Sequence, residues 1–251
     1  MAEDTQNPTP DSGVRLYVDQ DLGAGRPIAL TQEQANYLFA VMRLAVGAGI
    51  SLFNGRDGVW LARVAEANKR RGILICEAQT KPLQSPPDLW LLFTPVKKER
   101  TNFIVEKAVE LGVARLQPVS TRYMNSERWR LEKQQAHAIE AAEQCGASYV
   151  PELADLTPLD RVIAAWPEDR LLFWADEALV GQAVTPLEAY AKGTPSAILI
   201  GPEGGFSDEE KLKLRALPFV RPISLGPRIL RAETAALAAV TLWQASLGDW
   251  G

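Results

Sequence analysis

A strand, a turn and a helix follow one another directly in SAILIGPEGGFSDEEKL, residues 196–212. Residues 196–200 predict a buried strand, and the glycine-rich turn 201–205 leads from it into a helix with Ser207 as N-cap and Glu210 completing a capping box. Such a turn lets backbone approach a ligand closely at the carboxyl edge of a parallel sheet, although a plain tight turn is the alternative. It has neither the G-x-G-x-x-G pattern of dinucleotide sites nor the lysine of a phosphate-binding P-loop.

The sequence on both sides of this stretch repeats the same rhythm of apolar strands and helical segments of 10–20 residues. This alternation predicts a parallel sheet covered by helices, an α/β domain, over residues 89–251. The further strands are expected in LWLLFTPV (89–96), ARLQPV (114–119), RLLFWAD (170–176) and RPISLG (221–226).

The last helix is the second informative stretch. A short strand ends at Gly226, a long helix follows, and residues 234–247 carry no charge. A helix that is apolar around most of its circumference is buried in a core or in a subunit interface. Arg231 and Glu233 lie in its first turns, and residues two apart do not face each other on a helix. Each therefore needs another partner, in a site or a dimer contact.

The first third of the chain has a different pattern. Residues 15–81 contain short alternating runs split by turn signals, with a hairpin at FNGRDGVW (53–60) and one helix in TQEQANYLFAVMR (31–43) capped by Thr31. This pattern predicts a small β-barrel. The proline-rich residues 82–88 are expected to be a linker and residues 1–14 a disordered tail.

Composition excludes several classes of protein. The two cysteines and the single histidine of the 251 residues form no disulfide framework, zinc site or Ser-His-Asp triad, so no metal is expected. His137 is expected to be a partly exposed helix residue. No apolar run approaches the roughly 20 residues of a membrane span, and a reduced, cytoplasmic setting fits best.

Local charge matters more than the net charge of −4. Basic residues gather at 69–71, at 97–100 and near the C-terminus at Arg221, Arg228 and Arg231. Such clusters permit an anionic partner without establishing one, and a solvated surface is the simpler interpretation. The same holds for Lys97 and Arg100 on a predicted helix and for Arg122 after the next strand.

Taken together, these stretches resemble the ribosomal RNA small-subunit methyltransferase E family, of the SPOUT class of knotted methyltransferases. The resemblance covers most of residues 15–247, and GPEGG with SLGPRILRAETA is its most specific pair. The matching pieces, in the family's order, are RLYVD, YLFAVMRLAVGAGISLFNGRDGVW, KKERTNFIVEKAVELGV, IEAAEQCG followed by VPE, LIGPEGGFSDEE and SLGPRILRAETAALAAVTLWQ.

The resemblance implies a PUA-like RNA-binding barrel, then an α/β domain with a deep trefoil knot, acting as a homodimer. It implies S-adenosylmethionine as methyl donor and N3 of a uridine in small-subunit (16S) ribosomal RNA as acceptor. The donor would lie against residues carried over from the family's knot loops: Leu199, Gly201, Pro202, Glu203, Gly204, Gly205, Ser224, Leu225, Gly226, Ile229 and Leu230. Gly146-Ala147 departs from the Gly-Arg common in the family, which puts one RNA contact in doubt.

For the reaction, Arg231 is the hypothesis for stabilising negative charge on the uracil ring. Glu233 is a weaker candidate, for positioning Arg231 or accepting the N3 proton. Phosphate contacts are expected from Arg15, Lys97, Arg100 and Arg122. Two alternatives remain: methylation of another RNA base nitrogen or of a ribose 2′-hydroxyl, and a non-catalytic RNA-binding assembly factor. A nucleotide hydrolase is disfavoured because the P-loop lysine and a metal-binding acidic cluster are missing.

Overall fold

The computed structural model describes residues 11–125, 129–182 and 186–250, and the chain divides into two compact units. One unit comprises residues 1–85 with 143–149, and the other comprises residues 86–142 with 150–251. The division at Ser85 falls within the expected linker. The expected tail, 1–14, lies outside the described residues up to residue 10, but residues 11–14 belong to the first strand and correct that expectation.

The first unit is built on a mixed sheet. Within the described residues its strand order is β1-β3-β4-β5-β2, with β1 parallel to β3 and the other pairs antiparallel. The predicted hairpin 53–60 is confirmed, because β3 and β4 pair up to Phe53 and Val59. The strands are β1 (Asp11–Tyr17), β2 (Pro27–Ala29), β3 (Gly49–Phe53), β4 (Val59–Asn68) and β5 (Arg71–Lys81).

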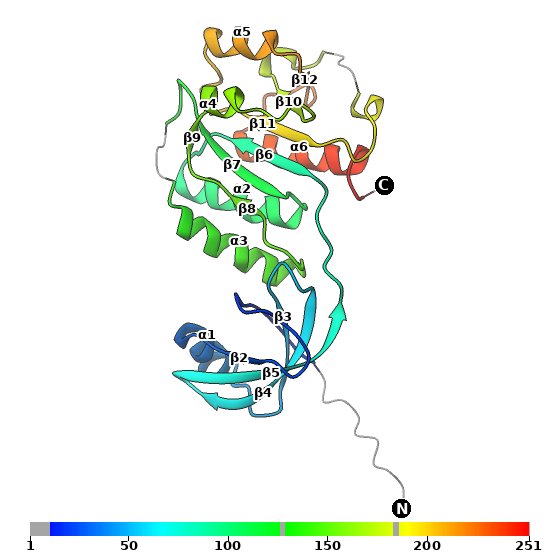
Figure 1. Ribbon diagram of the computed structural model, residues 1–251. Coiled ribbons are helices and arrows are strands. Elements are labelled where there is room, and N and C mark those ends of the chain that lie inside the picture. Colours follow the sequence, from blue (N-terminus) through cyan, green and yellow to red (C-terminus); the bar gives the residue numbers. More distant parts are fainter. Residues whose placement is uncertain (1–10, 126–128, 183–185, 251) are drawn as a thin grey trace, which may run out of the picture. The chain divides into compact units, whose positions relative to one another are not determined.

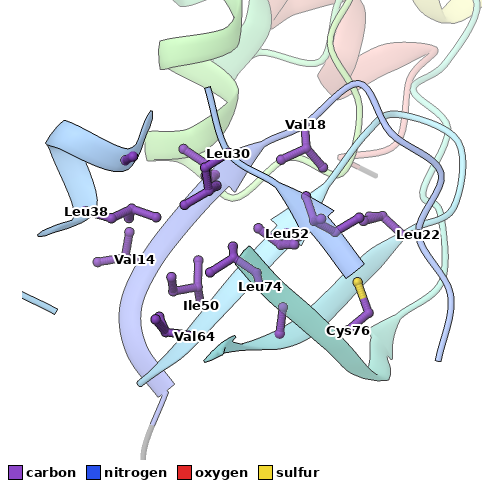
Figure 2. Packing of buried hydrophobic residues seen from close by; sticks show 14 residues of the cluster. Val14, Val18, Leu22, Leu30, Leu38, Ile50, Leu52, Val64, Leu74 and Cys76 are labelled. Atoms are coloured by element: carbon purple, nitrogen blue, oxygen red, sulfur yellow. The ribbon is translucent and has the colours of Figure 1, made fainter. Parts of the chain in front are cut away.

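The predicted helix of this unit is present in a modified form. The capping box of Thr31 and Gln34 starts α1 (Gln32–Asn36), which continues as the π-helical turn η1 (Tyr37–Val41). Leu38 of η1 packs into the core with alternate strand residues such as Ile50 and Leu74 (Figure 2). The wider turn keeps Leu38 inside while Tyr37 and Val41 remain exposed.

The second unit contains the predicted parallel sheet. Its order within the described residues is β12-β10-β11-β6-β7-β8, and β9 also pairs with β7. All these pairs are parallel, so the carboxyl ends of the strands meet at one edge. The strands are β6 (Leu89–Phe93), β7 (Arg115–Ser120), β8 (Glu152–Leu153), β9 (Thr157–Pro158), β10 (Leu171–Ala175), β11 (Ser196–Ile200) and β12 (Val220–Ile223).

Helices cover both faces of this sheet (Figure 1). On one face Leu159 of α4 and Leu214 of α5 join a core cluster with Leu199 of β11. On the other, α6 packs against α2, β6 and β11. None of the described helices is long and apolar enough to cross a membrane. The helices are α2 (Lys98–Glu110), α3 (Leu131–Cys145), α4 (Leu159–Ala164), α5 (Asp208–Ala216) and α6 (Ala232–Ser246), with short 3-10 turns η2 (Glu177–Leu179) and η3 (Leu187–Ala189).

Candidate active site

A cavity of about 370 Å³ lies at the carboxyl edge of the parallel sheet. Its wall is formed where β10, β11 and β12 end and where α6 begins, so separate parts of the chain meet around it. The lining residues are Arg100, Trp174, Ala175, Asp176, Glu177, Val180, Ile200, Gly201, Pro202, Glu203, Gly205, Phe206, Lys211, Ile223, Leu225, Arg228, Ile229, Leu230, Arg231, Ala232 and Ala235.

The glycine-rich turn after β11 forms one side of this cavity, and two of its glycines are too crowded for a side chain. A Cβ on Gly201 would overlap the ring of Phe206, and one on Gly205 would overlap the carboxylate of Glu177. Gly205 also has φ +70°, a conformation that L-residues rarely adopt. The predicted capping box of Ser207 and Glu210 starts α5 directly after the turn. Sequence and packing therefore leave the backbone of these two glycines without a side chain at the edge of the cavity.

Arg100 joins three segments of the cavity wall. Its guanidinium is ion-paired with Glu203 in the glycine-rich turn and with Glu233 in the first turn of α6, where Nε lies 3.4 Å from Oε1. The Glu233 side chain is 16% exposed, and its Oε2 is buried without a hydrogen-bond partner within the described part of the chain. Glu233 therefore faces Arg100 of α2 and has no described contact with Arg231.

Arg231 occupies the N-cap position of α6 and lines the cavity. It is exposed, and no hydrogen bond or ion pair joins its guanidinium to another described residue. A cation that no described carboxylate neutralises is available to a ligand in the cavity.

Strand β10 supplies lining residues that the sequence analysis missed. Trp174 is fully buried, and its indole N–H has no hydrogen-bond partner among the described residues. The next acidic residue, Asp176, accepts from the Ala178 amide at 3.0 Å and pairs with Arg215 at 2.7 Å. The available signal was positional: β10 ends at the same sheet edge as β11, where ligands of open α/β sheets bind.

Not every residue expected to hold the donor lines the cavity. Seven do, namely Gly201, Pro202, Glu203, Gly205, Leu225, Ile229 and Leu230. Leu199 is instead fully buried in the core beneath, and Gly204 packs on Tyr123, whose Cβ would lie 3.3 Å from an added methyl. Ser224 and Gly226 flank the lining residue Leu225.

The residues expected to contact phosphate are in different situations. Lys97 is exposed at the N-cap of α2. Arg122 is exposed at a second cavity, where its backbone N–H donates to Glu210. Arg100 is held in the two ion pairs already described. In the first unit, half-buried Arg15 donates to the Ala147 carbonyl at 2.7 Å and lies over the Phe53 ring.

Comparison with known proteins places this architecture. The RNA methyltransferase domain family matches residues 83–244, more than half of the chain, and the RNA methyltransferase PUA domain family matches residues 30–75. The Ribosomal RNA small subunit methyltransferase E of Buchnera aphidicola subsp. Schizaphis graminum is 31% identical over 94% of this chain and 97% of its own length. The chain belongs to this methyltransferase family.

Further relatives and solved structures match most of the chain. The Synechocystis methyltransferase E is 31% identical over 90% of this chain and 75% of its own length. The Neisseria gonorrhoeae methyltransferase E, solved bound to S-adenosyl methionine, superposes with a TM-score of 0.85 at 26% identity, covering 95% of this chain and 99% of that one. A putative methyltransferase from Legionella pneumophila in complex with the same cofactor gives 0.81 at 30% identity, covering 94% and 98%.

Proposed function

We propose that this methyltransferase transfers the methyl group of S-adenosylmethionine to N3 of a uridine in small-subunit ribosomal RNA. The single observation that carries the proposal is the cavity at the sheet edge, because the glycine-rich turn and the start of α6 meet there with Arg231, which has no partner among the described residues. The names of the methyltransferase E relatives and the cofactor-bound Neisseria structure support the substrate class and the donor.

The residues present fit S-adenosylmethionine. The cavity volume falls within the 300–1,000 Å³ of small-molecule sites, and its wall combines apolar side chains with bare backbone at the glycines. The buried indole N–H of Trp174 lacks a partner among the described residues and is available to a polar ligand atom. When bound, the donor supplies a methyl group on a sulfonium, whose leaving group is a neutral thioether.

We assign donor binding to the backbone and side chains of Gly201, Pro202, Glu203, Gly205, Leu225, Ile229 and Leu230, which line the cavity. We assign the four remaining residues to fixing the strand and loops that carry the lining residues; they are Leu199, Gly204, Ser224 and Gly226. The trefoil knot implied by the resemblance would be formed by these same loops, in a methyltransferase domain over residues 89–251.

Uridine N3 carries a weakly acidic proton, so negative charge develops on the uracil ring as the methyl group arrives. A fixed cation next to O2 or O4 lowers the energy of that transition state. We assign this role to Arg231 because the residue lines the cavity and its guanidinium has no partner among the described residues. The base must also be unpaired or flipped out, since N3 is a pairing atom.

Glu233 has a different role from Arg231. One of its oxygens faces Arg100, the other is buried, and the residue is not among those that line the cavity. We therefore assign Glu233 to holding Arg100 and the first turn of α6, with water as the acceptor of the N3 proton.

The same proposal extends to assembly and location. The charge-free part of α6 exposes Leu242, which is 48% accessible, and this face is where a homodimer would form. The substrate places the enzyme in the cytoplasm. Light scattering of the purified protein tests the dimer: a mass of one chain would exclude it.

The proposed function is tested by incubating the protein with S-adenosylmethionine labelled in its methyl group and unmodified small ribosomal subunits. Label in ribosomal RNA supports methyl transfer. Donor binding without label in RNA or in any subunit fraction would favour a non-catalytic RNA-binding factor.

A further inference from the structure

Four exposed cations lie around the first turns of α2 and α3. Lys97 and Lys98 are at the start of α2, and Arg130 and Lys133 are at the start of α3. None of the four has an ion pair with a carboxylate of the described residues. We call them the α2–α3 cation cluster.

The two helices bring these cations together. The Gln134 side chain donates to Asn102 Oδ1 at 3.0 Å, which joins α3 to α2, and the helices run side by side in Figure 1. Lys98 lies four residues before Asn102, one turn nearer the start of α2, and Arg130 lies four residues before Gln134. Because β6 and β7 are parallel neighbours, both helices begin at the carboxyl edge of the sheet.

Lys98 and Lys133 are close enough to repel each other. The charge of Lys98 is the main cause that lowers the pKa of Lys133, and Arg130 adds to it. The acidic residues of these turns, Glu99 and Glu132, are exposed and form no ion pair with the cluster among the described residues. The fold thus holds like charges together without a counter-ion among the described residues, and a polyanion is the ligand class that neutralises them.

The cluster adjoins the candidate active site. Lys97 lies within one turn of Arg100, and Arg100 lines the cavity and is held by Glu203 and Glu233. All of these residues belong to the same compact unit. An RNA strand that places one base in the cavity would therefore pass close to the cluster.

We propose that the α2–α3 cation cluster binds backbone phosphates of the RNA substrate next to the target nucleotide. The inference rests on the proposed function and adds Lys98, Arg130 and Lys133 to it. Lysine ammonium groups bind phosphate as point charges and carry no sequence information. The cluster therefore contributes to RNA affinity and to KM for RNA, but not to donor affinity or to kcat.

The experiment compares wild type with the K98Q/K133Q double variant by measuring binding to a small-subunit RNA fragment over a series of salt concentrations. The matched control is K192Q: Lys192 is an exposed lysine of the same unit, just before the amino end of β11, with no ion pair among the described residues. Loss of two phosphate contacts makes the negative slope of log affinity against log salt shallower by about 1.4, at ~0.7 per phosphate of single-stranded RNA. K192Q leaves the slope unchanged.

Three further readouts separate a binding role from a structural one. In K98Q/K133Q the Kd for S-adenosylmethionine stays at the wild-type value and Tm is not lowered, because a repulsion has been removed. K98R/K133R restores RNA affinity. The proposal that the cluster binds phosphate is overturned if the double variant keeps the wild-type salt slope and KM. It is also overturned if wild type binds the RNA with no salt dependence.

The outcome for the proposed function is separate. A wild type that loses RNA affinity on K98Q/K133Q substitution but forms no 3-methyluridine would overturn the assigned reaction and leave the cluster supported. If 3-methyluridine forms but the double variant binds RNA with unchanged affinity and KM, the assigned reaction is supported and the phosphate-binding role of the cluster is overturned.

Discussion

Arg100 Nε lies 3.4 Å from Glu233 Oε1, and this contact joins α2 to the first turn of α6. The same guanidinium is paired with Glu203 of the glycine-rich turn. One side chain thus links the loop assigned to the methyl donor with the helix whose N-cap is Arg231. The relationship explains how residues from distant parts of the sequence hold one cavity in shape.

Replacing Arg100 should disturb donor binding more than the chemical step. In R100Q the Glu233 carboxylate loses its cation, and the turn 201–205 loses its tie to α6. Because the three side chains are 16–36% exposed, a double-mutant cycle of R100Q with E233Q should give a coupling of about 1 kcal/mol in the free energy of unfolding. KM for S-adenosylmethionine should rise in R100Q and partly recover in R100K. Additive effects in the cycle would show that the contact is absent in solution.

Replacing Arg231 should instead lower kcat more than it weakens donor binding. R231A removes the cation proposed to stabilise charge on the uracil ring, so kcat should fall about 100-fold or more, as for the loss of an oxyanion-hole donor. The Kd for S-adenosylmethionine, measured by calorimetry, should change little. K192A serves as the control for loss of an exposed cation. A kcat in R231A within threefold of wild type would remove Arg231 from the reaction.

The glycine-rich turn offers a matched pair of substitutions. Gly205 and Gly193 both have positive φ, +70° and +76°, but an added Cβ meets Glu177 at Gly205 and nothing within 4 Å at Gly193. Both alanine variants should lose about 1 kcal/mol of stability to the left-handed backbone. Only G205A should also weaken donor binding, because its added methyl displaces the Glu177 carboxylate, and Glu177 lines the cavity. Equal donor affinities in the two variants would contradict the assignment of this turn.

The first unit should show a pH-dependent contribution from Asp57. Its Oδ2 accepts from the Leu22 backbone N–H at 2.9 Å and from the Asn54 side chain at 2.7 Å, and these hydrogen bonds lower the pKa of Asp57 below its ordinary value. A lowered folded-state pKa gives stability that is present above the unfolded pKa and is lost as pH falls through the folded one. D57N should therefore destabilise the protein at pH 7, and the difference should shrink towards pH 3 in urea denaturation. A difference that is constant with pH would refute this.

Much of the fold was predictable because local signals and tertiary structure agree. The strands at 89–93, 171–175 and 196–200, the capping boxes of Thr31 and Ser207, and the start of the last helix after Gly226 are confirmed. Each depends on periodicity or on contacts within four residues. The expected tail was wrong at residues 11–14, because pairing of β1 with β3 depends on a strand far along the chain.

The candidate site was predictable only in part, for the same physical reason. The sequence placed Gly205 and Arg231 correctly at the cavity, since both lie at element ends on the sheet edge. It did not predict that Arg100 would contact Glu203, or that Trp174 would line the wall, because those contacts join elements remote in sequence. It did not predict that Arg15 would donate to the Ala147 carbonyl, and the phosphate contact of Arg15 stays a prediction. The trefoil knot stays a prediction.

Methylation of uridine N3 is tested most directly by the chemical identity of the nucleoside that the protein makes. Unmodified small subunits would be incubated with the protein and S-adenosylmethionine, and their RNA digested and compared by mass spectrometry with isomeric methyluridine standards. We expect 3-methyluridine in the reaction with wild type and its near absence with R231A. A 2′-O-methylated or otherwise methylated nucleoside in its place would contradict the assignment of the reacting atom.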